Sequence, residues 1–229
     1  MTPTRTGRPG HRSRHVRSVY ELAAGHYEAY RRAWLAVAGR EADAVMLHQV
    51  VATGRPLKNP RVLDAGAGTG ALSRLLTTEL PHLRPVLADL SPRMLAEAPD
   101  VGGLRAVATL DALPFADDTF DIIACGWVIE TVARPAAVIT ELLRVLGPDG
   151  LLTYSFCSRP LRRLDRVRTG PLRSLVHAAF AGHFLTSRQT PFHECGRSSR
   201  RSFRAGLVTV ISLGKCCWVS PAMLPWRQR

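Results

Sequence analysis

A buried strand that runs into a glycine-rich loop constrains this 229-residue chain more than any other feature of its sequence. The segment reads RVLDAGAGTG over residues 61–70, where an aliphatic run stops at Asp64 and glycines stand at positions 66, 68 and 70. Such glycines allow a tight turn and bring backbone N–H groups close to a ligand, at the positive end of the following helix. The loop therefore predicts a ligand held at the end of the first strand.

Strand-like and helix-like segments alternate along the rest of the chain. We expect strands over residues 61–65, 85–89, 104–108, 120–125, 150–156 and 205–215, with a partner strand over 197–203, and helices over 71–79, 92–98, 135–146 and 171–181. Ser91 and Pro92 are typical of a helix start, Gly147-Pro148 is typical of a helix end, and residues 19–51 read as two helices broken around Gly39. Short strands that are apolar on both faces predict an α/β fold with a doubly wound, mostly parallel, seven-stranded Rossmann-like sheet and N-terminal helices.

The net charge of +13 is unevenly distributed along the chain. Residues 61–156 carry 7 basic and 12 acidic side chains, whereas residues 157–229 carry 14 basic and 2 acidic ones. An acidic core with basic ends argues against a protein wrapped around nucleic acid, although a basic segment attracts RNA, DNA or anionic lipid.

Targeting and cysteine patterns predict a cytoplasmic protein. No apolar run approaches the roughly 20 residues of a membrane helix, so we expect no transmembrane segment. No stretch at the start of the sequence resembles a secretory signal. The five cysteines are scattered without a CxxC pair, which predicts reduced thiols, and a lone His193-Glu194-Cys195 run lacks the second ligand pair of a metal site, so we expect no metal.

Two unrelated cofactors favour nearly the same glycine loop. Gly66 and Gly68, with Ala71 in the third place, satisfy the dinucleotide fingerprint, and Asp89 follows at about the distance at which an acid binds a ribose. Asp64 discriminates between them, because a carboxylate two residues before the first glycine would repel a pyrophosphate. That carboxylate favours a ligand with an ammonium group and a sulfonium nearby, as in S-adenosylmethionine.

Four ordered motifs extend this interpretation to a family. They read VLDAGAGTG (62–70), ADLSPRML (88–95), LPFADDTFDIIACGWVIE (113–130) and ELLRVLGPDGLL (141–152). In order and spacing, the chain resembles the class I S-adenosylmethionine-dependent methyltransferases, in particular the small-molecule branch that includes the ubiquinone/menaquinone-biosynthesis-type enzymes. The resemblance covers about 90 residues in the middle of the chain.

The resemblance implies which residues hold the cofactor. Asp64 and the backbone from Ala65 to Gly70, including Gly66 and Gly68, would hold the methionine end. Asp89 would bind the ribose hydroxyls, and Leu90 and Met94 would pack near the adenine. Thr109 and Leu110 stand where the family often has an Asp-Ala pair, so the adenine amino group would meet Thr109, a shifted Asp111, or backbone alone. Cys125 and Gly126 would line the cofactor near its reactive methyl group.

Methyl transfer needs alignment of nucleophile and methyl group more than a dedicated acid or base. Glu130, His26 and Tyr27 are weak candidates for a catalytic base, and His177, His183 and His193 lie where the family shapes its acceptor pocket. The place at which DNA-amino methyltransferases carry an Asn/Asp-Pro-Pro-aromatic tetrapeptide reads CGWV (125–128). Trp127 there predicts either a flat or apolar acceptor or a core tryptophan.

Within this resemblance we expect one methyltransferase domain over residues 17–217. It would comprise a helical lid (17–52), a cofactor core (61–157) and an acceptor-side region with the last strands (158–217), between a disordered basic tail (1–16) and a C-terminal tail (218–229). The favoured acceptor is a small-molecule or lipid-like compound; the acceptor atom and the oligomeric state stay open.

Two rival functions and the nicotinamide alternative follow from the remaining features. The arginines of 159–168 and 197–204 favour an RNA- or protein-modifying methyltransferase, although nucleic acid is possible rather than favoured as a partner. The departure at Thr109 and the tail CCWVSPAMLPWRQR (216–229) favour a non-catalytic methyltransferase-like binding protein. A nicotinamide enzyme ranks last, because no second catalytic domain is recognisable.

Overall fold

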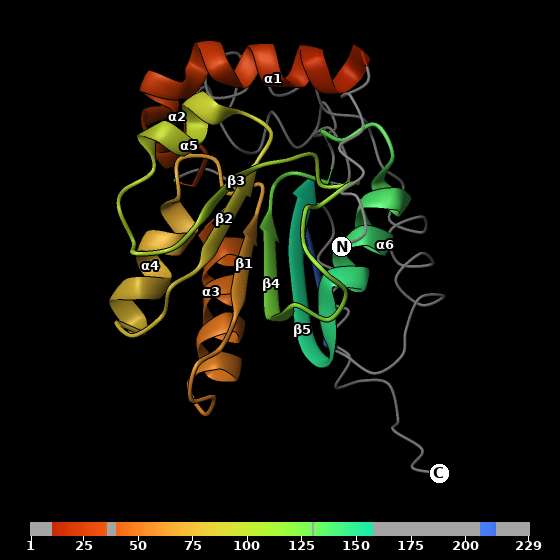
Figure 1. The fold of residues 1–229 in the computed structure, drawn as a ribbon. Helices are drawn as coiled ribbons and strands as arrows, with labels where there is room; N and C mark the ends of the chain where they lie inside the picture. The colour runs from red at the N-terminus through yellow and green to blue at the C-terminus, as the bar shows by residue number, and fades with distance from the viewer. Residues whose placement is uncertain (1–10, 36–39, 130, 158–206, 214–229) are drawn as a thin grey trace.

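The computed structural model describes residues 11–35, 40–129, 131–157 and 207–213 (Figure 1). The chain passes through α1 (His11–Ala23), η1 (Ala24–His26), α2 (Tyr27–Trp34), α3 (Arg40–Gly54), β1 (Val62–Ala65), α4 (Ala71–Glu79), β2 (Val86–Asp89), α5 (Pro92–Glu97), β3 (Arg105–Val107), β4 (Phe120–Gly126), α6 (Pro135–Val145), β5 (Leu146–Cys157) and β6 (Leu207–Leu213). The strands form one sheet of six in the order β3-β2-β1-β4-β5-β6, and every described pairing is parallel. The mostly parallel α/β, Rossmann-like architecture predicted from the sequence is thus confirmed.

The strand order creates one switch point, between β1 and β4. The chain moves outward from β1 to β2 and β3, then returns to the other side of β1 with β4. The loops after β1 and β4 therefore leave the sheet in opposite directions, and such a crevice at the carboxyl ends of the strands is where open α/β sheets bind ligands.

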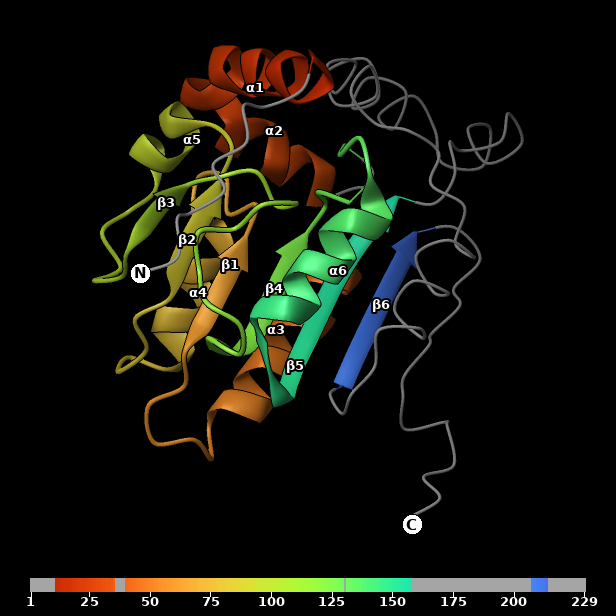
Figure 2. The same ribbon diagram turned by 45° about the vertical axis from the view of Figure 1, so that its right-hand side comes forward.

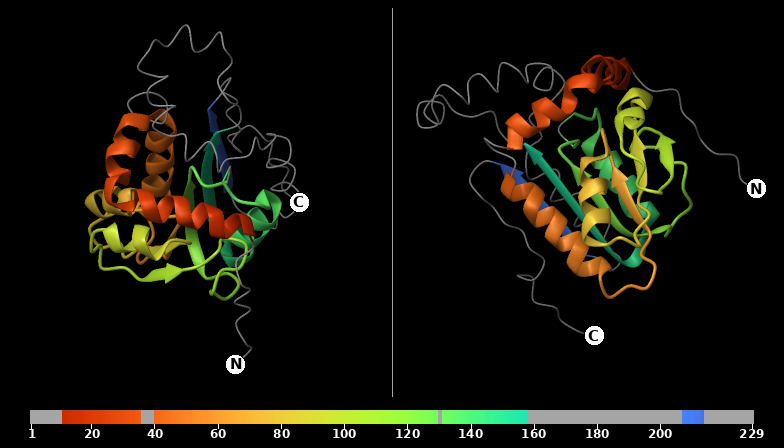
Figure 3. Two further views of the ribbon diagram at one scale, coloured as in Figure 1. Left: turned by 90° about the horizontal axis from the view of Figure 1, so that it is seen from above. Right: turned by 90° about the vertical axis from the view of Figure 1, so that its left-hand side faces the viewer.

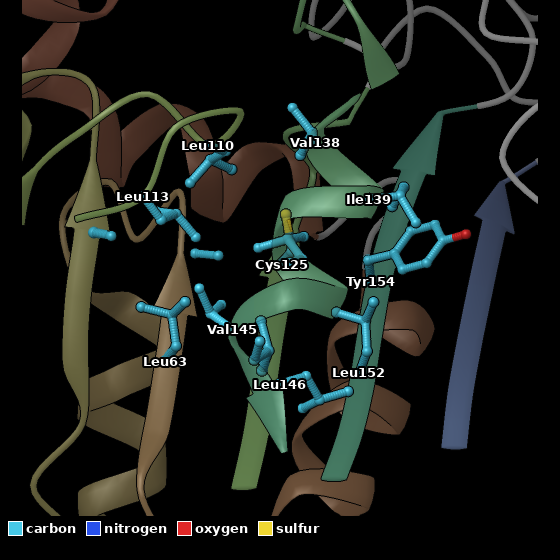
Figure 4. Close-up of a cluster of buried hydrophobic side chains, with 14 of the residues drawn as sticks. Leu63, Leu110, Leu113, Cys125, Val138, Ile139, Val145, Leu146, Leu152 and Tyr154 are labelled. Carbon is cyan, nitrogen blue, oxygen red and sulfur yellow. The ribbon is translucent and has the colours of Figure 1, made fainter. Parts of the chain in front are cut away.

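Two helical layers cover the sheet (Figure 2). Helix α6 packs on one face, where its residues Val138, Ile139 and Leu142 join a buried cluster with side chains from β1, β4 and β5 (Figure 4). Helices α3 and α4 cover the other face, and Val50 and Leu76 belong to a second cluster there. Both faces of each central strand are buried because its side chains alternate between these two layers.

Helix α1 lies across the carboxyl ends of the strands instead of on either face (Figures 1 and 3). It contacts η1 and α5, and Val16 is its buried residue. None of the helices in the described part of the chain combines the length and apolar character needed to cross a membrane.

Several boundaries predicted from the sequence are wrong. Residues 11–16 were expected in a disordered tail, but α1 begins at His11, because Val16 and the neighbouring lining residues pack over the strand ends. Residues 19–51 were expected to form two helices; the structure adds a break at η1 around Gly25. Helix α6 ends at Val145, and the Gly147-Pro148 pair expected to stop it lies within β5.

Other predicted elements are observed in the structure or lie outside the residues that it describes. Ser91 caps α5 by accepting a hydrogen bond from the Met94 N–H at 3.2 Å, with Pro92 in the first turn, as predicted. The strand expected over 205–215 is observed as β6. The helix expected over 171–181, the strand expected over 197–203 and both terminal tails lie outside the described residues, apart from the first turns of α1.

Candidate functional site

The loop between β1 and α4 holds three left-handed glycines. Gly66, Gly68 and Gly70 have φ angles of 75°, 55° and 70°, which L side chains rarely adopt. A Cβ atom on Gly66 would lie 2.3 Å from Cγ2 of Val128, in the loop after β4. The N–H groups of Gly66 and Ala67 both donate to the carbonyl of Ala88, at 2.7 and 3.0 Å. The loop is therefore fixed against β2 and packed tightly against the segment that follows β4.

Asp89 ends β2 and binds the glycine loop directly. Its Oδ2 atom accepts a hydrogen bond from the Gly68 N–H at 2.8 Å, and its Oδ1 accepts one from the Ser91 N–H at 2.8 Å. Burial raises the pKa of the Asp89 carboxyl above its usual range, against these backbone hydrogen bonds, which lower it. The carboxylate is held in one orientation before any ligand arrives.

Asp64 lies at the base of the same loop and is only 3% exposed. Its Oδ2 atom accepts hydrogen bonds from the Ser73 hydroxyl at 2.6 Å and the Ser73 N–H at 3.2 Å. Burial raises its pKa to about 6, the hydrogen bonds from Ser73 lower it, and the charges of Asp89 and Arg31 respectively raise and lower it. A cation beside Asp64 would relieve the cost of keeping this buried group ionised.

A first cavity, of about 860 Å³, opens beside Asp89. Its walls come from α1, the glycine loop, the ends of β2 and β4, and the segments after β3 and β4. The lining residues are Ser13, Val16, Arg17, Tyr20, Tyr27, Gly66, Gly68, Asp89, Leu90, Ser91, Met94, Ala108, Thr109, Leu110, Asp111, Gly126, Trp127, Val128, Thr131, Val132, Ala133 and Val138.

A second cavity, of about 720 Å³, opens beside Asp64. It is bounded by α2, α3, the glycine loop and the start of α4. The lining residues are Tyr27, Arg31, Leu35, Asp43, Met46, Asp64, Gly66, Ala67, Gly68, Thr69, Ala71, Leu72, Gly126 and Trp127.

The two cavities share a wall. Tyr27, Gly66, Gly68, Gly126 and Trp127 line both of them. A ligand could therefore cross from one cavity to the other along the glycine loop, with one end near Asp89, Asp111 and Arg17 and the other end near Asp64, Asp43 and Arg31.

The N-terminal helices are tied to the sheet across this site. Arg31 of α2 pairs with Asp43 of α3 at 2.9 Å, and Asp43 also accepts a hydrogen bond from the Trp127 indole N–H at 2.7 Å. Burial raises the pKa of Asp43, whereas the bonds from Trp127 and Arg31 lower it. Glu28 of α2 accepts a hydrogen bond from the Thr69 hydroxyl of the glycine loop.

Trp127 has an unusual backbone conformation for a large residue. Its φ angle is 59°, in the left-handed region, and its N–H donates to the Ser155 carbonyl at 3.0 Å. Such conformations persist only where the surroundings fix them, and they cluster at ligand sites. The core-residue alternative for Trp127 is wrong, because the side chain is only partly buried and lines both cavities.

Most residues predicted to bind the cofactor lie around the two cavities. The lining includes Asp64, Gly66, Gly68, Asp89, Leu90, Met94, Thr109, Leu110 and Asp111, together with Tyr27 from the candidate bases. Asp111 also pairs with Arg134 at 2.8 Å. Whether these residues bind a cofactor stays a prediction, but the structure places them together.

Other predicted site residues lie elsewhere. Cys125 is fully buried among Leu63, Ile139 and the rest of the α6-side cluster and lines neither cavity, because strand alternation turns it away from the loop (Figure 4). Ala65 faces the same cluster. Gly70 also lines neither cavity; its Cβ would meet that of Ala98 at 2.9 Å, so packing of α4 requires the glycine.

Of the remaining candidate bases and acceptor-pocket histidines, none is placed at either cavity by the described part of the structure. His26 is exposed and lines neither cavity. Glu130, His177, His183 and His193 lie outside the described residues. Within the described part of the chain, no group of three or more His, Cys, Asp or Glu residues could hold a metal ion.

Several lining residues were missed from the sequence. Arg31 and Asp43 come from the predicted lid, and Ser13, Arg17 and Tyr20 come from a segment whose first residues were expected to be disordered. Tyr27 and Arg31 stand four residues apart and so share one helix face, which is the one signal that could have placed Arg31 at the site.

Comparisons with known proteins agree with this geometry. The family model that matches residues 63–154 is described as a methyltransferase domain. A malonyl-[acyl-carrier protein] O-methyltransferase of Geobacter sulfurreducens is 32% identical over 147 residues, which is 62% of this chain and 52% of that protein. A demethylmenaquinone methyltransferase of Clavibacter sepedonicus is 36% identical over 122 residues, or 48% of this chain and 47% of that protein. The chain thus spans about half the length of these curated relatives.

A solved structure shares the fold. It is described as an S-adenosylmethionine-dependent methyltransferase, possibly a histamine N-methyltransferase, from Thermotoga maritima, and it aligns with a TM-score of 0.54 at 22% identity, covering 82% of this chain and 80% of that one. Residues 63–154 thus match a methyltransferase-domain model, and with the glycine loop, acidic strand ends and switch-point cavities described above, the chain is similar to class I S-adenosylmethionine-dependent methyltransferases of the small-molecule type.

Proposed function

We propose that this protein transfers a methyl group from S-adenosylmethionine to a small-molecule or lipid-like acceptor by in-line displacement. The observation that carries the proposal is the pair of adjoining cavities at the switch point, one built around Asp89 and the other around Asp64. S-adenosylmethionine has two parts that could occupy the two cavities: a nucleoside at one end and a charged amino acid at the other.

The first cavity suits the adenosine end. Asp89 presents a fixed carboxylate to which two ribose hydroxyls can donate, and Leu90, Met94 and Leu110 offer apolar contact to the adenine. The Gly68 cradle supports this fit, because a Cβ there would lie 3.2 Å from Cε of Met94 and so fill the space between loop and α5. Thr109 and Asp111 lie on the same wall and would meet the adenine amino group.

The second cavity suits the methionine end. Asp64 is a buried carboxylate whose ionisation is costly without a cation, and the ammonium and sulfonium groups of the cofactor supply positive charge. The bound cofactor supplies an activated methyl group. The chain itself supplies alignment and water exclusion, because α1 and α2 close over the strand ends and Arg12 of α1 donates to the Thr131 carbonyl at 3.3 Å.

The acceptor would enter next to Trp127 and Tyr27, which line both cavities and present aromatic surface. Tyr27 is the candidate base that the geometry keeps; its phenol could accept or relay a proton if the acceptor nucleophile must lose one. Relatives described as malonyl-[acyl-carrier protein] and demethylmenaquinone methyltransferases support an acyl or quinone-like acceptor. We also propose a cytoplasmic location and a seventh strand in the full sheet.

Isothermal calorimetry with S-adenosylmethionine and S-adenosylhomocysteine tests the cofactor assignment. We expect micromolar binding of both, and a loss of about 10–100-fold in Asp89→Asn, because a hydrogen-bonded charge is removed from the ribose site. Asp149→Asn is the matched control, since Asp149 is exposed and lines neither cavity. Absence of heat with the wild type, or equal affinity in both variants, would reject the proposal.

Mass spectrometry then tests for transfer. Cell extract is incubated with the protein and a cofactor that carries a deuterated methyl group, and one metabolite is expected to gain the labelled methyl. Asp89→Asn should reduce that gain at a cofactor concentration that just saturates the wild type, because the variant is then only partly occupied. Labelled protein or RNA without a labelled small molecule would favour the alternative class of acceptor.

A further inference from the structure

The charged side chains that line the second cavity match the charged groups at the methionine end of the cofactor. Its described lining contains two carboxylates, Asp43 and Asp64, and one cation, Arg31. With both acids ionised, one negative charge is in excess. The methionine end of S-adenosylmethionine carries an ammonium, a sulfonium and a carboxylate, and so one excess positive charge. The cavity and the ligand are therefore complementary in net charge as well as in the number of each kind of group.

We propose, on the basis of the function proposed above, that Arg31 binds the α-carboxylate of the cofactor and that Asp43, held by Trp127, is the positioning residue that orients Arg31. Arg31 was not among the residues expected to bind. Its side chain is 17% exposed, and it belongs to α2, one turn beyond Tyr27.

The position of Asp64 determines where the ammonium group and the carboxylate of the cofactor's amino acid lie in the second cavity. The start of α4 would ordinarily attract a carboxylate, since its N–H groups form the positive end of the helix. Here that end is already occupied by Asp64, which accepts from the Ser73 N–H and hydroxyl. A ligand carboxylate placed there would face a buried carboxylate. The ammonium group is therefore the end that approaches Asp64, and the carboxylate must find another cation.

Among the described residues that line the second cavity, Arg31 is the cation that can bind the ligand carboxylate. It is close enough for its charge to lower the pKa of Asp64, so the two side chains act on the same space. Its Nη2 atom donates to Oδ2 of Asp43 at 2.9 Å. A guanidinium carries five N–H donors in a fixed fork and can bind a second carboxylate while keeping the first.

Asp43 in turn is fixed by Trp127. The indole N–H donates to its Oδ1 atom at 2.7 Å, on the side opposite to the oxygen that binds Arg31. Trp127, whose backbone φ angle is in the left-handed region, thus reaches from the end of β4 to α3. The chain of contacts runs from the end of β4 through α3 to α2, so the loop that borders the acceptor also sets the position of the cofactor-binding arginine.

The test compares two ligands in calorimetry. S-adenosylhomocysteine has the amino acid end, whereas 5′-methylthioadenosine has the same nucleoside and sulfur without it. For Arg31→Gln we expect the Kd for S-adenosylhomocysteine to rise about 10–100-fold, while that for 5′-methylthioadenosine changes less than about threefold. Arg32→Gln is the matched control, because Arg32 is the next residue of α2, is exposed and lines neither cavity.

Two further variants test the positioning role. Asp43→Asn and Trp127→Phe should each raise the Kd for S-adenosylhomocysteine about 3–10-fold and leave that for 5′-methylthioadenosine unchanged, whereas a merely structural defect would weaken both. Equal weakening of both ligands in Arg31→Gln, or no weakening of either, overturns the inference. A wild type that binds neither ligand rejects the proposed function instead, so the two failures are distinguishable.

Discussion

Asp64 accepts two hydrogen bonds from a single residue, Ser73, and both reach the same carboxylate oxygen, at 2.6 Å from the hydroxyl and 3.2 Å from the backbone N–H. The arrangement holds a carboxylate at the start of α4 while burial raises its pKa to about 6. In the ligand-free protein, the ionised Asp64 carboxylate lowers the free energy of unfolding, because it is buried away from water. A bound cation would offset this loss of stability.

Asp64→Asn should therefore stabilise the ligand-free protein at neutral pH. The folded-state pKa lies above the unfolded one, so ionising Asp64 costs stability as pH rises through the interval from about 4 to 6, and the full cost remains above it. Removing the charge should raise the free energy of unfolding at pH 7.5 by about 1–3 kcal/mol. Thermal melts at pH 7.5 and pH 4.5 would measure this.

The gain should be much smaller at pH 4.5, where Asp64 is already protonated in the folded protein, and should vanish below about pH 4, where the unfolded chain is protonated as well. Asp149→Asn, at an exposed position, serves as the control and should leave both melts unchanged. At pH 7.5 the stabilised Asp64→Asn protein should bind S-adenosylmethionine at least about tenfold more weakly. A variant that is less stable than the wild type at pH 7.5 would contradict this account of Asp64.

Cofactor affinity should fall in acid for the same reason. A proton on Asp64 competes with the ligand ammonium group, so the Kd for S-adenosylmethionine should be flat above about pH 7 and rise about tenfold by pH 5. The hydrogen bond from the Ser73 hydroxyl lowers the pKa of Asp64. Ser73→Ala removes this bond, so the pKa of Asp64 should rise and the loss of affinity should begin at a higher pH. An unshifted profile in Ser73→Ala would exclude Asp64 as the titrating group.

The contact between Gly66 and Val128 should dominate the cost of changing the loop. Alanine at position 66 would be strained by its φ angle of 75° and would clash with Cγ2 of Val128 at 2.3 Å. We expect Gly66→Ala to lose about 2–4 kcal/mol in urea unfolding, from the strain and the clash together.

The double variant with Val128→Ala separates these two causes. It should recover the part of the loss due to the clash and retain about 1–2 kcal/mol due to the left-handed backbone. Gly25→Ala is a useful control, because nothing lies within 4 Å of a Cβ built there. Additive effects of the two substitutions would show that the contact carries no energy.

The sequence was most informative where a local pattern and the sheet agreed. The glycine loop, Asp64 and Asp89 follow short apolar strands, and parallel strands bring their carboxyl ends to one edge, so these groups could be placed together in advance. The N-terminal cap of α5 follows from Ser91 and Pro92 alone.

What the sequence did not reveal depends on contacts between distant segments. Residues 11–16 look disordered by composition, yet they form a helix because the open ends of the strands offer a surface for Val16. Arg31 enters the site through Asp43 and Trp127, which stand 12 and 96 residues away in the chain. Cys125 was placed at the cofactor because it follows the strand, but alternation along β4 turns it into the core.

The neighbours Cys125 and Gly126 offer a direct test of this last correction. Cys125 is fully buried in the α6-side cluster, whereas Gly126 lines both cavities, and its Cβ would lie 3.0 Å from the flexible end of Met46. Cys125→Ala should lower stability by about 1 kcal/mol and leave the Kd for S-adenosylhomocysteine within twofold.

Gly126→Ala should have the opposite effects. The added methyl group enters the wall that the two cavities share and should raise the Kd for S-adenosylhomocysteine about 5–10-fold. Little stability should be lost, because the φ angle of Gly126 is not in the left-handed region. Thermal melts and calorimetry on the two variants measure both quantities. Weakened binding in Cys125→Ala at unchanged stability would return Cys125 to the cofactor site, because a residue confined to the core cannot change affinity without first changing the fold around it.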